Sequence, residues 1–137
     1  MKATLAAGLE ATTTITVDRE RTIGFMGEAA RVYATPALVR DIELAARELV
    51  LAHLDPGEDS VGTRVEIDHL AASLLGQQVT LKLTVADVKG RAVSLEVEGH
   101  DGVDTICRGR HNRFVVDVKA TQARLAAKAA KAGLAGP

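Results

Sequence analysis

Aromatic side chains are scarce in this chain of 137 residues, which has no Trp, one Tyr (Tyr33) and two Phe. Proteins that bind single-stranded nucleic acids usually stack bases on aromatic rings, so the composition argues against that function. Hydrophobic residues nevertheless make up 47% of the sequence. We therefore expect a core of Val, Leu, Ile and Ala in a single domain, 1–137, with the core at about 10–118 and a tail at 119–137.

An excess of charge of either sign is also lacking, because 17 Lys and Arg residues are balanced by 18 Asp and Glu. This balance gives no electrostatic reason to expect nucleic acid or a membrane as a partner.

Cys107 is the only cysteine, so no disulfide can form within the chain and a cytoplasmic location is expected. No run reaches the roughly 20 apolar residues of a membrane span. The stretch 1–17, interrupted by Glu10 and several Thr, does not resemble a signal peptide.

The strongest local signal is a helix that begins at Thr35-Pro36 and ends before the turn Asp55-Pro56-Gly57. Thr is a favoured N-cap residue, and Pro is a favoured first helical residue. Between these two points, apolar residues occupy most of the helix circumference, which is typical of a buried helix. We therefore expect this helix at the centre of the fold.

Residues that favour strands lie on both sides of this helix. The Thr, Ile and Val-rich run 12–17 precedes it and is followed by a loop at 18–30 with a short helical turn. After the helix the apolar period changes to two, which predicts four strands joined by short connections and ending at about 105–118. The Ala-rich tail predicts a further helix from Ala120 to Gly133.

The order of these elements predicts an α+β domain in which five antiparallel strands wrap around one long buried helix. This arrangement is the hot-dog fold. A sheet of this kind leaves an open edge, and the pairing of two chains edge to edge would cover it.

Three polar side chains, Thr35, Glu43 and His69, occupy positions that the helix and strand periods assign largely to the interior. Because burial of ionisable groups is costly, an acid, a base and a hydroxyl in aliphatic surroundings indicate hydrolytic or acyl-transfer chemistry. Structural alternatives remain open for each residue. Thr35 has a sufficient role as the helix N-cap. Glu43 is spaced for an i,i+4 salt bridge with Arg47, and His69 is also explained as a packed core residue.

Two further residues stand out in the predicted strands. Gly62 interrupts the start of one strand, which indicates either a β-bulge or the close approach of another group to the backbone. Arg113 lies in the last strand, either as a solvated edge charge or as a group that binds a carboxylate or phosphate.

The His residues and Cys107 show no metal-ligand spacing, so no metal site is expected. Nucleotide-binding and serine-hydrolase motifs are also lacking.

These positions belong to segments that resemble the fluoroacetyl-CoA thioesterase family of hot-dog proteins. The resemblance covers roughly residues 10–120. It rests on the following segments: Tyr33-Ala34-Thr35, Asp41-Ile42-Glu43-Leu44-Ala45, Pro56-Gly57-Glu58, Ser60-Val61-Gly62-Thr63, Asp68-His69-Leu70-Ala71-Ala72, His100-Asp101-Gly102-Val103-Asp104 and Gly109-Arg110-His111, with Arg113 in register. As a set they are far more specific than any one segment.

The resemblance implies a catalytic trio of Thr35, Glu43 and His69, with Gly62 and Arg113 at the end of the site that holds the substrate and its CoA. It also implies a homodimer in which residues of both subunits shape each pocket, and it leaves open whether dimers pair into tetramers. The expected reaction is hydrolysis of a small acyl-CoA thioester, with CoA as part of the substrate and no separate cofactor. Glu43 would act as nucleophile or as general base, and His69 would transfer protons.

The stretch between Thr22 and Thr35 departs from the family pattern. It is shorter and holds only Phe25 and Tyr33 as aromatic residues, whereas the fluoroacetate-specialised member has an aromatic-rich lid there. We therefore expect another acyl-CoA as the substrate.

One alternative to this function is a non-catalytic hot-dog module that binds an acyl-CoA or a small apolar acid. Hydration or dehydration of an acyl thioester is disfavoured, because the helix pattern typical of those enzymes is absent around Glu43.

Overall fold

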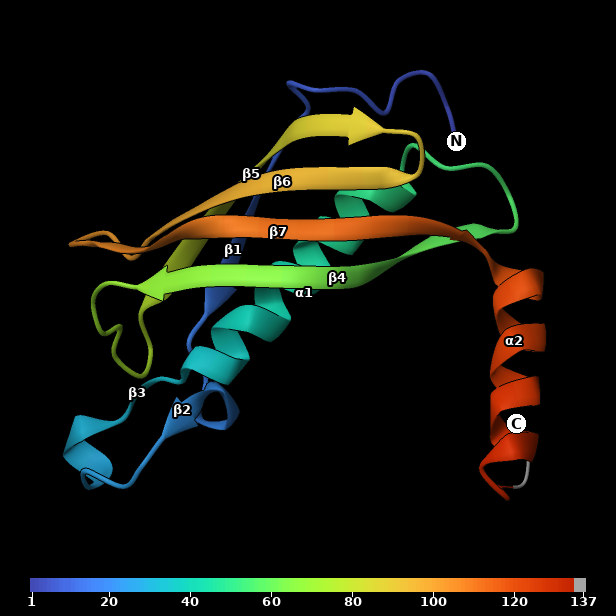
Figure 1. Ribbon diagram of the computed structural model, residues 1–137. Coiled ribbons are helices and arrows are strands. Elements are labelled where there is room, and N and C mark those ends of the chain that lie inside the picture. Colours follow the sequence, from blue (N-terminus) through green and yellow to red (C-terminus); the bar gives the residue numbers. More distant parts are fainter. Residues whose placement is uncertain (135–137) are drawn as a thin grey trace.

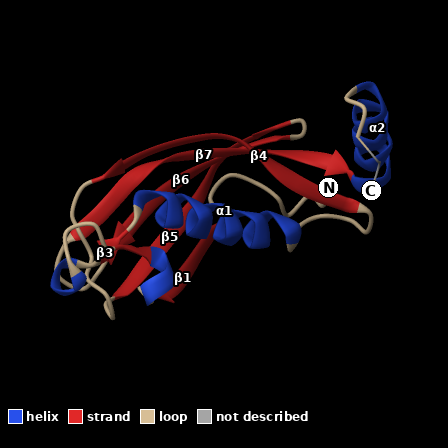
Figure 2. Cartoon of the chain, turned by 90° about the horizontal axis from the view of Figure 1, so that it is seen from below, coloured by secondary structure: helices blue, strands red, loops and turns tan. Residues whose placement is uncertain are grey.

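The computed structural model describes residues 1–134 of the chain. A five-stranded antiparallel sheet curves around one long helix, α1 (Thr35–Leu51), as Figure 1 shows. The helix lies against the concave face of the sheet (Figure 2). Along the sheet the strands follow the order β1 (Glu10–Thr16), β5 (Gln78–Lys89), β6 (Ala92–His100), β7 (Thr105–Asp117) and β4 (Glu58–His69). The predicted hot-dog fold is confirmed, and β1 and β4 form its two edges.

The helix α1 forms the centre of the core because its apolar residues recur on one side. Pro36 occupies the first turn, where its missing N–H group is not needed. Leu38, Ile42, Ala46 and Val50 follow one another at every fourth position and are fully buried. The core is aliphatic, as the scarcity of aromatic residues predicted, and Tyr33 is its one aromatic member among the described residues.

The strands alternate buried and exposed side chains, which turns one face of the sheet toward α1. In β5 the odd-numbered residues from Val79 to Val85 are buried, while those between them are exposed or half-buried. β4 pairs with β7 over its whole length, with one register shift between Gly62 and Arg64. This shift is a β-bulge, which is one of the two explanations predicted for Gly62.

The loop predicted at 18–30 contains more structure than its sequence indicated. Its elements are the 3-10 turns η1 (Arg19–Arg21) and η2 (Glu28–Ala30) and the strand β2 (Thr22–Ile23), which pairs with β3 (Val32–Tyr33). Strands of two residues have no periodic pattern, so this small sheet was not predicted. We call residues 18–34 the flap.

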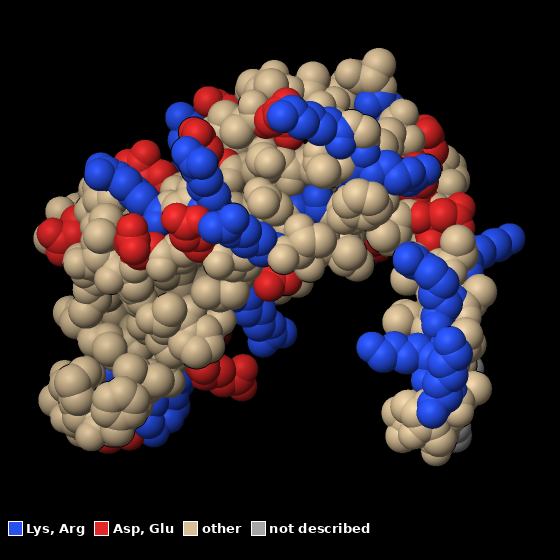
Figure 3. Space-filling view, viewed as in Figure 1, with Lys and Arg blue, Asp and Glu red and all other residues tan. Residues whose placement is uncertain are grey.

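A second helix, α2 (Val118–Lys131), continues from the end of β7 and stands away from the sheet (Figure 1). Asp117 caps it by accepting a hydrogen bond of 2.8 Å from the Ala120 backbone N–H. None of its residues is buried, and Lys and Arg side chains line it (Figure 3). The predicted tail helix is thus confirmed. No helix within residues 1–134 is long and apolar enough to cross a membrane.

Gly109 allows β4 and β7, the two strands that carry most of the candidate residues, to lie close together. A Cβ atom at this position would collide with the Glu66 carbonyl oxygen and would lie 2.7 Å from Ile67 Cδ1. We expect Gly109→Ala to push the strands apart and to lower the free energy of unfolding by about 1–3 kcal/mol, the usual cost of overpacking.

Urea denaturation would measure this loss. Glu66→Ala is the matched control, because it removes an exposed side chain and leaves the backbone contact unchanged, at an expected cost within about 0.5 kcal/mol. Equal stability of Gly109→Ala and the parent protein would contradict the prediction.

Candidate active site

Thr35 is the first residue of α1, and its hydroxyl is bonded to His69 rather than to the helix backbone. Ala34 holds the N-cap position, and no side chain caps this helix end. Thr35 Oγ1 lies 2.8 Å from His69 Nδ1 at the end of β4. The prediction that Thr35 acts as the N-cap is therefore wrong. The helix begins one residue earlier than the sequence signal indicated, which leaves the hydroxyl free for the strand.

The other nitrogen of the His69 ring, Nε2, is buried and has no hydrogen-bond partner within the described chain. An unpaired buried polar group costs about 1–3 kcal/mol, so such an atom requires an explanation such as a catalytic role. Burial also lowers the pKa of His69, which keeps the imidazole neutral near pH 7. His69 therefore differs from a packed core histidine with both nitrogens satisfied, which was the predicted alternative.

Thr35 and His69 line a hollow of about 310 Å³ between the flap and the loop that follows β4. The Tyr33 ring meets the His69 ring edge to face, with ring centroids 6.3 Å apart. The remaining walls are aliphatic and consist of Ile23, Val32, Leu70, Ala71 and Ala72. The hollow can therefore hold a small apolar group beside a hydroxyl and an imidazole.

Glu43 lies farther along α1, where it is half-buried and faces β4. A Cβ atom on Gly62 would come within 3.2 Å of Glu43 Oε2, so the glycine leaves room for the carboxylate beside the backbone. Both explanations of Gly62, the bulge and the close approach, therefore hold. The alternative predicted for Glu43, a salt bridge with Arg47, does not form. Arg47 instead donates two hydrogen bonds, of 3.0 and 2.6 Å, to the carboxylate of Asp59.

Arg113 is buried near this carboxylate, with only 4% of its surface exposed. Its Nε and Nη2 donate hydrogen bonds of 2.7 Å to the side-chain and main-chain oxygens of Ser60. Burial lowers the pKa of Arg113, and the negative charge of Glu43 opposes that change. The alternative of a solvated edge charge is wrong, because β7 lies between β6 and β4 and Arg113 is on its buried face.

His111, on the same buried face of β7, was not predicted as a candidate residue. Its Nδ1 donates to the Arg64 carbonyl oxygen at 2.8 Å, and its Nε2 accepts from Arg113 Nη1 at 3.2 Å. Burial lowers the pKa of His111, and both hydrogen bonds fit a neutral ring. The alternation of side chains along a strand could have identified His111, because it places His111 on the same face as Arg113, two residues away.

One chain therefore holds two separate groups of candidate residues. The first half-site consists of Thr35 and His69, and the second half-site consists of Glu43, Gly62, His111 and Arg113. Thr35 and Glu43 are eight positions apart on α1, a rise of about 12 Å at 1.5 Å per residue. The predicted trio of Thr35, Glu43 and His69 is thus not brought together within a single chain.

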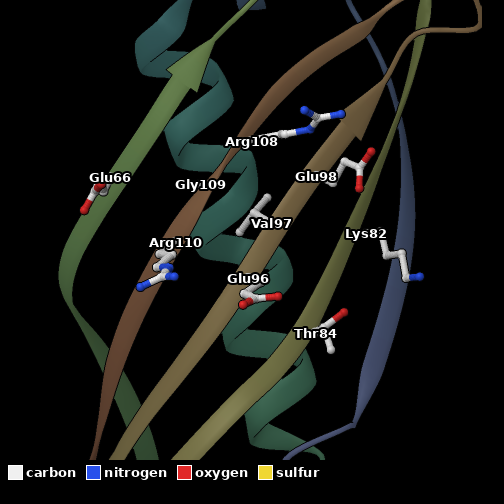
Figure 4. A pocket seen from close by; sticks show the side chains of 9 residues that line it. All are labelled: Glu66, Lys82, Thr84, Glu96, Val97, Glu98, Arg108, Gly109 and Arg110. Atoms are coloured by element: carbon white, nitrogen blue, oxygen red, sulfur yellow. The ribbon is translucent and has the colours of Figure 1, made fainter.

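A larger hollow, of about 680 Å³, lies on the outer face of the sheet. It is lined mainly by charged side chains of neighbouring strands (Figure 4). Glu96 is opposite Arg110 in the strand register, and Glu98 is opposite Arg108. Opposite charges on neighbouring strands are typical of a solvated sheet face, and the sheet separates this hollow from both half-sites.

Comparison with known proteins shows the family of the chain. The sequence model of the fluoroacetyl-CoA-specific thioesterase family matches residues 17–119. The protein belongs to this family. The fluoroacetyl-CoA thioesterase of Streptantibioticus cattleyicolor is 37% identical over 101 residues, which cover 74% of this chain and 73% of the relative.

Solved structures agree with this assignment. A mutant of the fluoroacetyl-CoA thioesterase in complex with acetyl-CoA has a TM-score of 0.83 at 30% identity and covers 90% of this chain and 98% of its own. A thioesterase superfamily member from Thermus thermophilus has a TM-score of 0.79 at 32% identity and covers 86% of this chain and 88% of its own. The resemblance to the fluoroacetyl-CoA thioesterase family is thereby confirmed. The family match includes both half-sites, whereas nearly all of α2 lies beyond it.

Acidification is expected to destabilise this thioesterase-family protein through the buried His111 and the half-buried His69. Burial lowers the pKa of His69 and of His111 in the folded state, so protons bind preferentially to the unfolded chain. Their stabilising contribution is complete above the unfolded-state pKa of about 6.5 and is lost as the pH falls through the folded-state values. The loss is at most about 1.4 kcal/mol per pH unit for each histidine.

Urea denaturation between about pH 7.5 and pH 5 would measure this dependence. His111→Gln should reduce the loss of stability on acidification, because it removes one of the two titrating groups. A pH dependence that is the same in His111→Gln and in the parent protein would show that His111 is not responsible.

Proposed function

We propose that this protein hydrolyses small acyl-CoA thioesters to the carboxylic acid and free CoA, with Thr35, Glu43 and His69 as its catalytic residues. The observation that carries the proposal is the 2.8 Å contact of Thr35 with His69 beside an aliphatic hollow, with the second ring nitrogen unpaired. Membership of a thioesterase family supports the reaction type. CoA enters as part of the substrate, and the proposed chemistry uses side chains and water.

The hollow favours a short apolar acyl group. No charged side chain lines it, and Tyr33 is its one aromatic wall residue. Phe25 at the tip of the flap is 82% exposed and does not reach the hollow. The relative from Streptantibioticus cattleyicolor is a fluoroacetyl-CoA thioesterase. Because the flap of this chain brings so little aromatic surface to the hollow, we propose a short aliphatic acyl-CoA as the substrate.

In the proposed reaction the neutral His69 carries protons, and Thr35 holds its ring. The thioester carbonyl lies near the start of α1, where unpaired backbone N–H groups and the helix dipole stabilise the negative charge that develops on its oxygen. Glu43 either attacks the carbonyl carbon, forming a mixed anhydride that water then hydrolyses, or takes a proton from the attacking water. In both routes the C–S bond breaks and the CoA thiolate receives a proton through His69.

Access of the substrate to His69 Nε2 requires a small displacement of the atoms that cover it, since this nitrogen is buried. The flap borders the hollow through Ile23, Val32 and Tyr33. Its tip is exposed, as Phe25 shows, and is held mainly by surface contacts.

A dimer formed through β4 would join the two half-sites. β4 is an edge strand, so its outer side has no partner strand within residues 1–134. Antiparallel pairing with β4 of a second copy across a two-fold axis places the His69 end of one strand beside the Gly62 end of the other. The first half-site of each chain then faces the second half-site of its partner, which supplies Glu43. Glu43 would thus act across the interface.

The alternative function is a binding module that holds an acyl-CoA without turnover. One observation favours it, namely that the half-sites are about 12 Å apart in a single chain. A chain that did not dimerise through β4 would keep the hollow but would lack a carboxylate beside His69.

Free-thiol release from a panel of acyl-CoAs, from acetyl to decanoyl with fluoroacetyl and phenylacetyl, tests the proposed function. We expect release with short acyl groups, and we expect Glu43→Gln and His69→Ala each to lower kcat by about 10²-fold or more, because each removes a proton-transfer group or nucleophile. Glu48→Gln is the matched control, since it neutralises an exposed carboxylate of the same helix.

Near-normal hydrolysis by both Glu43→Gln and His69→Ala would reject the assigned residues. No thiol release by the wild-type protein across the panel, together with CoA binding in calorimetry, would establish the binding module instead.

Co-expression of two inactive variants tests whether each site uses both chains. In a mixed dimer of Glu43→Gln and His69→Ala chains, one site has both groups intact and the other has neither. Random pairing is therefore expected to restore about a quarter of the wild-type rate. If the trio acts within one chain, every site lacks one group and the rate stays at the level of the separate variants.

A further inference from the structure

Asp41, the most deeply buried carboxylate of α1, has no part in the proposed reaction. It is 5% exposed and accepts two hydrogen bonds from Arg21, from Nε at 2.9 Å and from Nη2 at 3.1 Å. The hydroxyl of Tyr33 donates a short hydrogen bond to the same carboxylate. Helix α1 is thereby tied to both ends of the flap, at Arg21 and at Tyr33.

Stability alone does not account for this arrangement. Replacing a buried ion pair with apolar residues of similar size is often neutral or stabilising, because the desolvation cost of the charges offsets their attraction. Position 41 borders the apolar face of α1, about one turn after the fully buried Leu38, so an aliphatic residue would pack there. What the charged group adds is a directed bond to the Tyr33 hydroxyl.

Tyr33 is fixed at both of its ends. Its backbone N–H donates to the Ser73 carbonyl oxygen at 2.8 Å, and its hydroxyl is bonded to Asp41. Burial, and then the Asp41 carboxylate, raise the pKa of the phenol, so it remains a proton donor at all working pH values. Only 2% of the residue is exposed. The orientation of its ring is therefore determined by Asp41 together with the core.

The fixed ring of Tyr33 stands against His69. The two ring planes are 81° apart with centroids at 6.3 Å, within the range of favourable edge-to-face contacts. The hydroxyl of Thr35 fixes one nitrogen of the imidazole, but a single hydrogen bond leaves the ring free to tilt about it. The Tyr33 ring opposes this tilt and so determines the direction of Nε2.

We propose that Asp41 and Tyr33 are positioning residues for His69, with Arg21 holding the Asp41 carboxylate in place. This inference rests on the proposed function, in which His69 transfers protons. Asp41 acts through Tyr33 and touches neither the hollow nor the substrate. Loss of the Asp41–Tyr33 bond loosens the imidazole and lowers the rate of proton transfer, while the hollow that binds the acyl group keeps its lining.

Steady-state kinetics of Tyr33→Phe, Asp41→Asn and the double variant test the proposal. Each single variant is expected to lower kcat about tenfold, with KM within about twofold, because misplacing a catalytic group affects the chemical step more than binding. Since Asp41 acts through Tyr33, the double variant should be no slower than the slower single variant. Losses that multiply in the double variant would overturn the proposed order of action.

Glu28→Gln is the matched control. Glu28 pairs with Arg19 at 2.7 Å and with Arg31 at 3.1 Å, so the variant weakens the flap without touching Tyr33 or His69. A purely structural role of Asp41 predicts the same kinetic effect for Glu28→Gln at equal loss of melting temperature. We expect instead that Glu28→Gln leaves kcat within about twofold.

A spectroscopic measurement separates this proposal from the proposed function. ¹⁵N NMR of the His69 ring should show one dominant tautomer in the wild-type protein and tautomer exchange in Tyr33→Phe, whether or not thioesters are hydrolysed. A wild-type protein without thioesterase activity would reject the proposed function alone. Unchanged His69 ring signals in a folded Tyr33→Phe variant would overturn the positioning role, also where Asp41→Asn fails to fold.

Discussion

The packing of α1 against the concave face of the sheet determines where every candidate residue lies. The helix buries a row of aliphatic side chains at every fourth position, and close packing of this kind leaves it little freedom to slide or rotate. Thr35 at its start and Glu43 two turns later are therefore held at fixed points. β4 runs past them in the opposite direction and brings His69 to the first and Gly62 to the second. The spacing of the half-sites thus follows from the geometry of one helix.

The same packing removes polar and charged groups from water, and within residues 1–134 their buried side-chain atoms have hydrogen-bond partners with one exception. Asp41 is bonded to Arg21 and Tyr33, while Arg113 is bonded to Ser60 and to His111. The hydrogen bonds of Arg113 hold its guanidinium in place in the second half-site. His69 is the exception, with one ring nitrogen unpaired. This contrast between satisfied groups and one unsatisfied atom supports the proposal that His69 takes part in the reaction.

Helix and strand periods were sufficient to predict the fold, because α1 and the long strands each repeat their apolar pattern several times. The roles of single residues depended on partners that lie far away in the sequence. The N-cap preference of Thr35 carries no information about His69, and the solvated alternative for Arg113 failed because strand order places β4 outside β7. Asp41 could have been noticed at the edge of the apolar arc. Its partner Arg21 could not have been identified, because Arg21 lies in a loop without a periodic pattern.

Pairing through the edge of β4, as proposed, would make the activity depend on the concentration of the protein itself. When each site needs the carboxylate of a second chain, dilution separates the half-sites without unfolding either chain, and the rate per chain falls as dimers dissociate. A single chain would still hold an acyl group in its hollow but would release it unchanged. The affinity between two strand edges, rather than the chemistry of the thioester, then sets the lowest protein concentration at which hydrolysis occurs.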